Sequence, residues 1–355
     1  MKIVVLAGGI STERTVSLCS GAGICKALRS VGHQAILVDS FLGLPDYVGP
    51  LENAFLREDG FLTDISIEKA APSLEEVKKA RGGNPDCHVG PNVLALCEKA
   101  DFVFLGLHGE DGEDGKIQAT LHLLGIPYSG SSYLSSGMAM DKTVTKRIMD
   151  GYGIRNAPWQ EIVVTEENAE EYAKTLPLPC VIKTPTGGSS IGVCIPENRQ
   201  ELLEGLKELS RLNHRVLVEK RIYGREITVP VLDNDYLPAI EIVPPEGSYF
   251  DYVAKYQSGD EGARELCPAP ISEEAFREMG EMALKLHRAL NLSVYSRSDF
   301  ILDEKGIPYC LEVNTLPGMT PASLFPKAAA EIGMTYTQLC DKIVSLSLEA
   351  RKEGR

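Results

Sequence analysis

The sequence predicts an α/β protein with an N-terminal, Rossmann-like parallel sheet followed by a larger α+β part. Near the N-terminus, short apolar runs alternate with a helical spacing of apolar residues, as in strand–helix–strand units. After Pro127 short strands and helices follow one another without that regular alternation. The length of 355 residues is more than one core usually needs and predicts two or three domains.

The N-terminal elements are predicted from apolar spacing. Residues 3–7 form the first strand, and a helix follows with apolar positions three and four apart from Val16 to Val31. Two more apolar runs, at 34–39 and 101–107, predict parallel strands beside the first. Between them, residues 45–92 are rich in Gly, Pro and charge and are predicted to be an insertion with one short helix near 74–81.

The elements after Pro127 are predicted in the same way. Ser272 is a favourable N-cap for the last of the predicted helices. The expected strands are 161–164, 180–183, 193–195, 216–219, 226–232 and 236–243, and the expected helices are 141–151, 199–212 and 272–291. We expect three domains, at 1–130, 131–222 and 223–355.

Composition excludes several classes of protein. The formal net charge of -14 argues against nucleic acid or an anionic membrane as a partner, because both would repel the chain. The nine cysteines lack metal-binding spacing and indicate reduced thiols in the cytoplasm. The first apolar run is too short for a signal peptide, and no run approaches the ~20 residues of a membrane span. We expect a soluble cytoplasmic protein that acts on small molecules.

The strongest chemical signal is a predicted hairpin near the C-terminus. Arg297 and Asp299 lie two apart on one strand, and Glu312 and Asn314 lie two apart on the next, so all four side chains are expected on one face. A four-residue turn at 303–306 would place Glu312 opposite Arg297, and Asp299 opposite Cys310. Leu311 and Val313 would then face the core. Two carboxylates and an amide oxygen are ligands suited to Mg²⁺.

A glycine-rich loop follows Lys183 and runs to Gly192 between two apolar strands. Glycines let a backbone approach phosphate closely, and the serine amides and hydroxyls can donate to it. The loop is not a Walker A motif, because no GxxxxGK[ST] occurs. By itself it fits a phosphate site and an ordinary hairpin equally well.

Three further segments are candidates for binding. Residues 8–17 connect a strand to a helix but lack GxGxxG, so dinucleotide binding rests only on Asp39 and is disfavoured. Glu13 there either favours the helix dipole or holds a substrate ammonium. His108 follows a strand and precedes an acidic, glycine-rich loop, a typical ligand-facing position. Lys255 and Tyr256 lie in a polar stretch typical of a lid.

Together these segments form an ordered set of motifs that spans residues 2–339. Taken as a set, they resemble the D-alanine–D-alanine ligase family of the ATP-grasp superfamily. The motifs are Gly-Gly-x-Ser-x-Glu-Arg-x-Val-Ser at 8–17, Leu-His-Gly at 107–109, Gly-Glu-Asp-Gly at 112–115, Met-Asp-Lys at 140–142, Gly-Ser-Ser-x-Gly at 188–192, Asp-Tyr…Lys-Tyr at 251–256, Arg-x-Asp at 297–299 and Leu-Glu-Val-Asn-Thr-x-Pro-Gly-Met-Thr at 311–320.

The resemblance implies a two-part ATP-grasp fold after the N-terminal domain, and a homodimer. It implies an ATP-dependent ligase that joins two D-alanines for peptidoglycan through an acyl phosphate. ATP and two Mg²⁺ (or Mn²⁺) would be bound, and D-alanine would be the substrate.

The resemblance also implies a role for each site residue. Asp299, Glu312 and Asn314 would hold the metals, and Lys142, Lys183, Glu219, Glu226 and Lys255 would bind ATP. The substrates would be held by Val16, His108, Ser323 and Leu324. Glu13, Ser189 and Tyr256 would form a triad that closes the lid, and Arg297 and Gly318 would stabilise the oxyanion.

Small departures from the family pattern leave the chemistry intact. Arg221 stands where an aromatic residue often follows the Glu-Lys of the adenine strand. Ser296 precedes Arg297 where Gly or Ala is common, and Thr184 stands between Lys183 and Pro185. Two other functions stay open: a ligase that accepts D-lactate or D-serine, and a non-catalytic ATP-binding regulator. The Lys-Tyr pair at 255–256 favours an amine acceptor.

Overall fold

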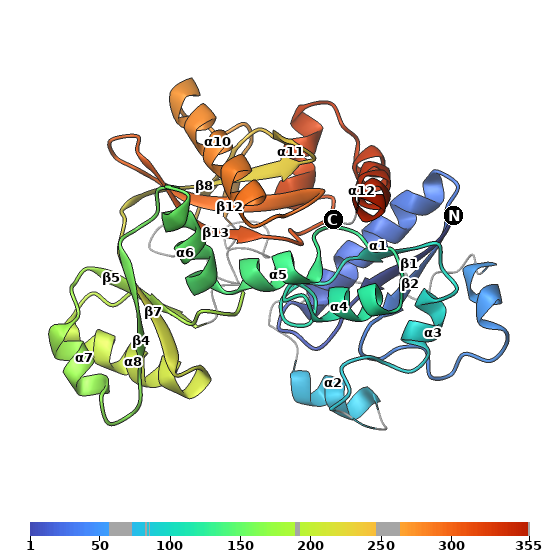
Figure 1. The fold of residues 1–355 in the computed structure, drawn as a ribbon, viewed down its shortest axis with the longest axis horizontal. Coiled ribbons are helices and arrows are strands. Elements are labelled where there is room, and N and C mark those ends of the chain that lie inside the picture. The colour runs from blue at the N-terminus through green and yellow to red at the C-terminus, as the bar shows by residue number, and fades with distance from the viewer. Residues whose placement is uncertain (57–72, 82–83, 85, 189–191, 246–262, 354–355) are drawn as a thin grey trace.

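A computed structural model describes residues 1–56, 73–81, 84, 86–188, 192–245 and 263–353 of the chain. Within these ranges the strands form three sheets, each with helices packed against it (Figure 1). The first sheet is parallel and the other two are antiparallel, which confirms the predicted α/β class.

The N-terminal sheet has the order β2-β1-β3, with all strands parallel. Strand β1 at its centre and strand β3 at its edge are buried on both faces, as the unbroken apolar runs predict. Gly21 allows the first helix to lie directly on the sheet, because a Cβ there would be 2.6 Å from the Cβ of Ala7. The elements are β1 Lys2–Ala7, α1 Arg14–Ser30, β2 Gln34–Asp39, η1 Leu51–Leu56, α2 Leu74–Arg81, α3 Val93–Cys97, β3 Phe102–Leu105, α4 Lys116–Leu123 and α5 Tyr133–Met140.

The central sheet has the order β4-β7-β5-β6 and carries α7 and α8 on one face, where they enclose their own apolar core (Figure 1). The helix that leads into it is capped by Asp141, whose side chain accepts hydrogen bonds from the amides of Thr143 and Val144. The elements are α6 Lys142–Gly151, β4 Trp159–Val163, α7 Ala169–Thr175, β5 Cys180–Lys183, β6 Val193–Cys194, α8 Arg199–Leu212 and β7 Arg215–Lys220.

The C-terminal sheet has the order β11-β10-β8-β12-β13, and β9 also pairs with β8. The long helix α10 covers one face, capped as predicted by Ser272, and leaves the other face toward the central sheet. The elements are β8 Gly224–Leu232, β9 Asp235–Tyr236, β10 Ile240–Val243, β11 Arg264–Leu266, α10 Glu273–Ala289, β12 Tyr295–Asp303, β13 Pro308–Asn314, α11 Leu324–Glu331 and α12 Tyr336–Lys352.

The last helix, α12, returns to the N-terminal part and packs against α1 (Figure 1). The Arg351 guanidinium donates to the Gly130 carbonyl and lies 4.0 Å from the centre of the Tyr128 ring. The Ser347 hydroxyl accepts the Gly130 amide at 3.2 Å. No helix in the described ranges is long and apolar enough to cross a membrane.

The β12–β13 hairpin confirms the predicted face but not the predicted register. Asp299 lies opposite Glu312, and Arg297 opposite Asn314, two residues from the predicted pairing. One residue of this shift arises at the turn, where Leu302 pairs with Pro308, and the other arises from a β-bulge at Leu311. The prediction assumed an unbroken ladder. The bulge also turns Leu311 toward the cavity described below, so of the two residues expected in the core only Val313 is there, 5 % exposed.

The packing of α10 on the sheet generates a stability prediction. A Cβ at Gly280 would lie 2.4 Å from the Tyr236 ring, so Gly280→Ala should lower the free energy of unfolding by about 1–3 kcal/mol despite its better helix propensity. Gly151→Ala is the matched control, since nothing lies within 4 Å of a Cβ there. Denaturant titration of both variants tests this; a Gly280→Ala protein as stable as Gly151→Ala would contradict the packing.

Candidate active site

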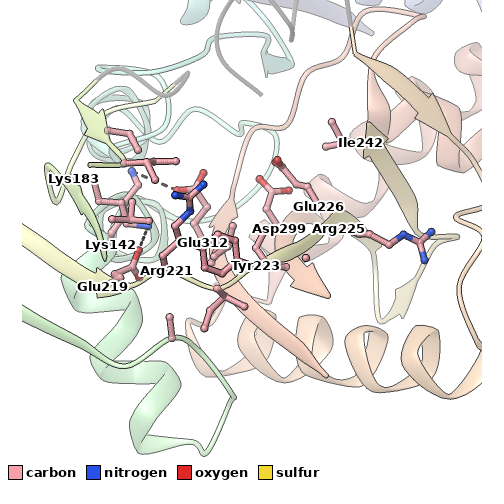
Figure 2. Close-up of a pocket in the computed structure, with 18 of the residues that line it drawn as sticks. Lys142, Lys183, Glu219, Arg221, Tyr223, Arg225, Glu226, Ile242, Asp299 and Glu312 are labelled. Atoms are coloured by element: carbon pink, nitrogen blue, oxygen red, sulfur yellow. Dashed lines mark ion pairs between the residues drawn. The ribbon is translucent and has the colours of Figure 1, made fainter. Parts of the chain in front are cut away.

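A cavity of about 650 Å³ lies between the central and C-terminal sheets. Figure 2 shows lysines and glutamates from the central sheet and α6 on one side and acidic residues of β8 and β12 on the other. The sequence analysis predicted six of the residues that line it: Lys142, Lys183, Glu219, Glu226, Asp299 and Glu312.

Two lysines lie beside the start of the glycine-rich loop. Lys142, the first residue of α6, donates through Nζ to the Gly187 carbonyl at 2.8 Å and lies 3.5 Å from a Glu312 oxygen. Lys183 ends β5, and its Nζ lies 2.5 Å from Glu219. Burial disfavours the Lys183 charge, but Glu219 and Glu312 outweigh burial and raise its pKa. The two lysines therefore place positive charge in the cavity beside the start of the glycine-rich loop.

Glu219 is buried and its carboxylate is shared by two lysines. One oxygen pairs with Lys183 and the other with Lys146, a fully buried residue of α6. Burial alone would raise the pKa of Glu219, but Lys183 and Lys146 together lower it. Glu219 was predicted to lie on the strand that recognises adenine. Its side chain pairs with the two lysines, so adenine recognition would fall to the backbone near the end of β7.

The hairpin face gathers the predicted metal ligands and the predicted arginine. Asp299 accepts two bonds from Arg297, each 3.0 Å, one from Thr228 Oγ1 at 2.6 Å and one from Asn314 Nδ2 at 3.0 Å. Glu312 lies directly across from Asp299. In the part of the chain that is described, no cluster of three or more His, Cys, Asp or Glu side chains forms a metal site, so a cation here would use the two carboxylates and the Asn314 amide oxygen.

His108 is buried at the end of the N-terminal sheet and reaches the C-terminal part of the chain. Its Nδ1 is 3.1 Å from the Leu316 carbonyl, and its Nε2 is 3.1 Å from the Ser20 hydroxyl. A carbonyl only accepts, so Nδ1 carries the proton and Nε2 accepts from Ser20. Burial lowers the His108 pKa more than nearby Glu13 raises it, which keeps the ring neutral.

Glu113 binds the backbone amide of the same residue, Leu316, and was assigned no role from the sequence. Its carboxylate accepts the Gly109 amide at 2.8 Å and the Leu316 amide at 3.4 Å. Burial, and then the charge of Glu13, raise the pKa of Glu113 to about 8. The Gly-Glu-Asp-Gly motif at 112–115 was the signal that could have identified it.

Glu13 lies where the N-terminal loop meets the glycine-rich loop. A Cβ on Gly188 would lie 2.9 Å from its carboxylate, and one on Gly109 would lie 3.2 Å from it. Glu13 is 8 % exposed at the N-terminus of α1. The structure thus brings Glu13, His108 and Glu113 together beside Leu316, two residues beyond Asn314.

The segment after Leu316 contains the remaining predicted residues. Gly318 is close to Ser323, since a Cβ on the glycine would be 3.0 Å from the Ser323 Oγ. Ser323 is the N-cap residue of α11, and its Oγ accepts the Thr320 amide at 3.1 Å. Leu324 begins the helix with a buried side chain, so only its amide can face a ligand.

Other predicted residues lie elsewhere. Ser189, Lys255 and Tyr256 fall outside the described residues. Val16 is buried in the first turn of α1, 2 % exposed. Asp39, the acid that a dinucleotide site would need, is paired with Arg14 and accepts hydrogen bonds from the amides of Phe41 and Leu42. Its carboxylate is therefore engaged within the fold, and the one feature that favoured dinucleotide binding no longer supports it.

Arg221 lies at the cavity wall with its guanidinium 4.6 Å from the centre of the Tyr223 ring and 2.6 Å from a Glu197 oxygen. The Arg221 guanidinium thus lies over the Tyr223 ring, at a position where the family often has an aromatic residue.

Comparison with known proteins gives consistent matches over nearly the whole chain. Two family models match: "D-ala D-ala ligase N-terminus" over residues 2–131 and "D-ala D-ala ligase C-terminus" over residues 148–345. The D-alanine–D-alanine ligase of Pediococcus pentosaceus is 41 % identical over 344 residues, 97 % of each chain. That of Lacticaseibacillus casei is 38 % identical over 354 residues, 100 % of this chain and 98 % of the other.

Solved structures agree with these relatives. The Bacillus anthracis D-alanine–D-alanine ligase complexed with ATP superposes with a TM-score of 0.74 at 30 % identity, covering 100 % of both chains. With its ATP-grasp fold and the site between its sheets, this chain belongs to the D-alanine–D-alanine ligase family.

Proposed function

We propose that the protein is an ATP-dependent ligase that joins two D-alanines into D-alanyl-D-alanine for peptidoglycan. The observation that carries this proposal is the junction at Leu316. There the hairpin that lines the cavity with Asp299 and Glu312 leads into Leu316, whose backbone is bound by His108 and Glu113 beside Glu13. One half of the site suits a nucleotide and the other suits an amino acid.

In the first half-reaction, the carboxylate of one D-alanine attacks the γ-phosphate of ATP and yields an acyl phosphate and ADP. Lys142 and Lys183 would bind the phosphates, and Glu226, which lines the cavity on β8, the ribose. Phosphoryl transfer depends mainly on such positioning and charge neutralisation. Mg²⁺ on Asp299, Glu312 and Asn314, two ions by family expectation (or Mn²⁺), would supply further neutralisation when bound.

In the second half-reaction, the amine of the other D-alanine attacks the acyl carbonyl and phosphate leaves. Glu13 would hold the ammonium of the first D-alanine, beside a neutral His108. Arg297 and the Gly318 amide would donate to the developing oxyanion. Arg297 makes two hydrogen bonds to Asp299, through Nε and Nη2, and its guanidinium carries further N–H donors. Ser323 and the Leu324 amide, at the start of α11, would bind the carboxylate of the second D-alanine.

Glu113 completes this arrangement by holding a proton. Its pKa, raised to about 8 by burial and the charge of Glu13, keeps it largely protonated at neutral pH, so it would not compete with Glu13 for the ammonium. The predicted link from Glu13 through Ser189 to Tyr256 remains a proposal; Gly188, next to Ser189, does lie against Glu13. Closing that link would exclude water from the acyl phosphate.

The three sheets support the proposed division into domains at 1–130, 131–222 and 223–355. The homodimer is proposed as well. α4 and α5 lie side by side and expose Leu123 (85 %), Tyr133 (44 %) and Leu134 (60 %), an apolar patch that suits a second copy.

Two alternatives predict different products. A ligase for D-lactate or D-serine would release ADP with D-alanine plus that acceptor and form the corresponding product. A non-catalytic regulator would bind ATP and form none, yet this chain keeps the predicted metal ligands and Arg297. We therefore expect ADP release that requires Mg²⁺ and D-alanine, with D-alanyl-D-alanine as the product even when D-lactate is added near neutral pH.

Glu312→Gln should lower the rate of ADP release roughly 100-fold or more, because it removes a charge that faces Lys142 and the proposed metals. The rate is measured by coupled ADP detection with saturating substrates. Glu304→Gln, in the exposed turn of the same hairpin, is the control and should match the unchanged chain. An active Glu312→Gln enzyme would exclude the proposed metal site.

The proton on Glu113 gives a prediction about pH. Its pKa rises from 4.5 in the unfolded chain to about 8 in the folded one, so its contribution to stability is full below 4.5 and is lost as pH rises through 8. Glu113→Gln mimics the protonated form and lacks this loss. The stability of the unchanged chain relative to Glu113→Gln should fall between these pH values in denaturant titrations. A difference independent of pH would show that Glu113 is charged throughout.

The dimer is tested by light scattering. Leu134→Asp should shift the mass from two chains to one, because a carboxylate in a buried apolar interface lacks a partner. Leu212→Asp, 61 % exposed at the end of α8, should leave the mass unchanged. A protein that is monomeric before any substitution would refute the homodimer.

A further inference from the structure

Lys146 is the one lysine among the twelve largest fully buried side chains, and neither the sequence motifs nor the proposed reaction use it. It lies four residues after Lys142 on α6, so both side chains project from one face of the helix. Lys142 reaches the mouth of the cavity, where it is 12 % exposed, whereas Lys146 reaches beneath the floor, 0 % exposed. There its Nζ pairs with Glu219 and lies 3.3 Å from Asn156 Oδ1.

Without this residue, the paired charges around the floor would cancel. Glu219 is the direct partner of Lys183, and Glu312 is the partner of Lys142. These two pairs alone sum to zero, which would leave the lysines that face the cavity without net charge to offer a phosphate. With Lys146 the cluster has three lysines against two glutamates, a net charge of one positive unit.

A surface lysine would have little effect, because water screens it. Lys146 is different, since it is held in the low-dielectric interior directly behind the carboxylate that faces the cavity. Figure 2 shows Glu219 beside Lys183 at one wall, with Lys142 and Glu312 next to them. Lys146, on the other oxygen of Glu219, therefore adds positive electrostatic potential at the place where the phosphates of ATP would bind.

We propose that Lys146 is a positioning residue for nucleotide binding: by neutralising Glu219 from behind, it leaves the charge of Lys183 available to the phosphate chain. Glu219 is then a bridge that orients Lys183 rather than a counterion that cancels it. The inference rests on the proposed function, because it requires that the cavity binds ATP.

The test is Lys146→Met in the full chain, with nucleotide affinity measured by titration calorimetry. Methionine keeps the length and apolar stem of the side chain, and Glu219 keeps Lys183 as its partner, so the variant should fold. We expect the affinity for ATP to fall about tenfold, that for ADP by less, and that for adenosine not at all. A charge effect scales with the number of phosphates, whereas a distorted cavity would weaken all three ligands equally.

The double variant Lys146→Met/Glu219→Gln provides the decisive comparison. It removes one charge of each sign and returns the cluster to one positive unit, so ATP affinity should recover most of the loss. Lys174→Met, on the exposed face of α7, is the control and should bind like the unchanged chain.

Equal losses for ATP and adenosine, or no recovery in the double variant, would overturn the role of Lys146. These outcomes are distinct from failure of the proposed function, in which the unchanged chain would bind no ATP.

Discussion

The bulge at Leu311 is the constraint on which the site depends. It places Asp299 directly across from Glu312, with Arg297 and Asn314 as the next pair, while Phe300 and Cys310 stay on the core face. A slip of one residue would turn these side chains to the opposite face. The bulge fixes the register at the one point where a carboxylate pair is needed, and α10 holds the other face of the sheet.

Leu316 joins this hairpin to the N-terminal sheet. Its carbonyl accepts from His108 and its amide donates to Glu113, so both backbone polar groups of this residue are bound by one loop. The partners come from a segment about 200 residues earlier in the chain. Any displacement of the N-terminal loop is therefore passed to the backbone that leads into Gly318, and the two halves of the site cannot be adjusted separately.

Much of the site could be predicted from sequence because it is built from local patterns. Residues two apart on a strand share a face, so alternation predicted that Arg297 groups with Asp299, and Glu312 with Asn314. The prediction that both groups share one face stayed correct because the observed register differs from the predicted one by two residues, which leaves the faces unchanged. The register did not follow, since nothing in the residues around Leu311 marks a bulge. The predicted helices and strands were found within a few residues. The short elements α3, α4, α5, α7 and β11 were missed, and no bounds were predicted for α11 and α12.

The roles of Lys146 and Glu113 depend on their surroundings in the fold, and only Glu113 had a signal in the sequence, the Gly-Glu-Asp-Gly motif at 112–115. From the sequence alone, a lysine in a helix that also carries Arg147 and Asp150 is expected on a solvent-exposed face. Apart from that motif, a glutamate in an acidic loop cannot be distinguished from the acidic residues beside it. Only the packing of α6 on the central sheet, and of the loop on Leu316, shows that each is enclosed.

The return of α12 to the N-terminal sheet has a consequence for how the protein is made. Leu339, Cys340, Ile343 and Val344 belong to the same apolar core as β1 and β3, which are synthesised more than 200 residues earlier. That core stays open on one side while the ribosome adds the intervening segments, and it closes only when the final helix emerges. During synthesis the N-terminal sheet must therefore be protected from aggregation until α12 has been made and can pack on it.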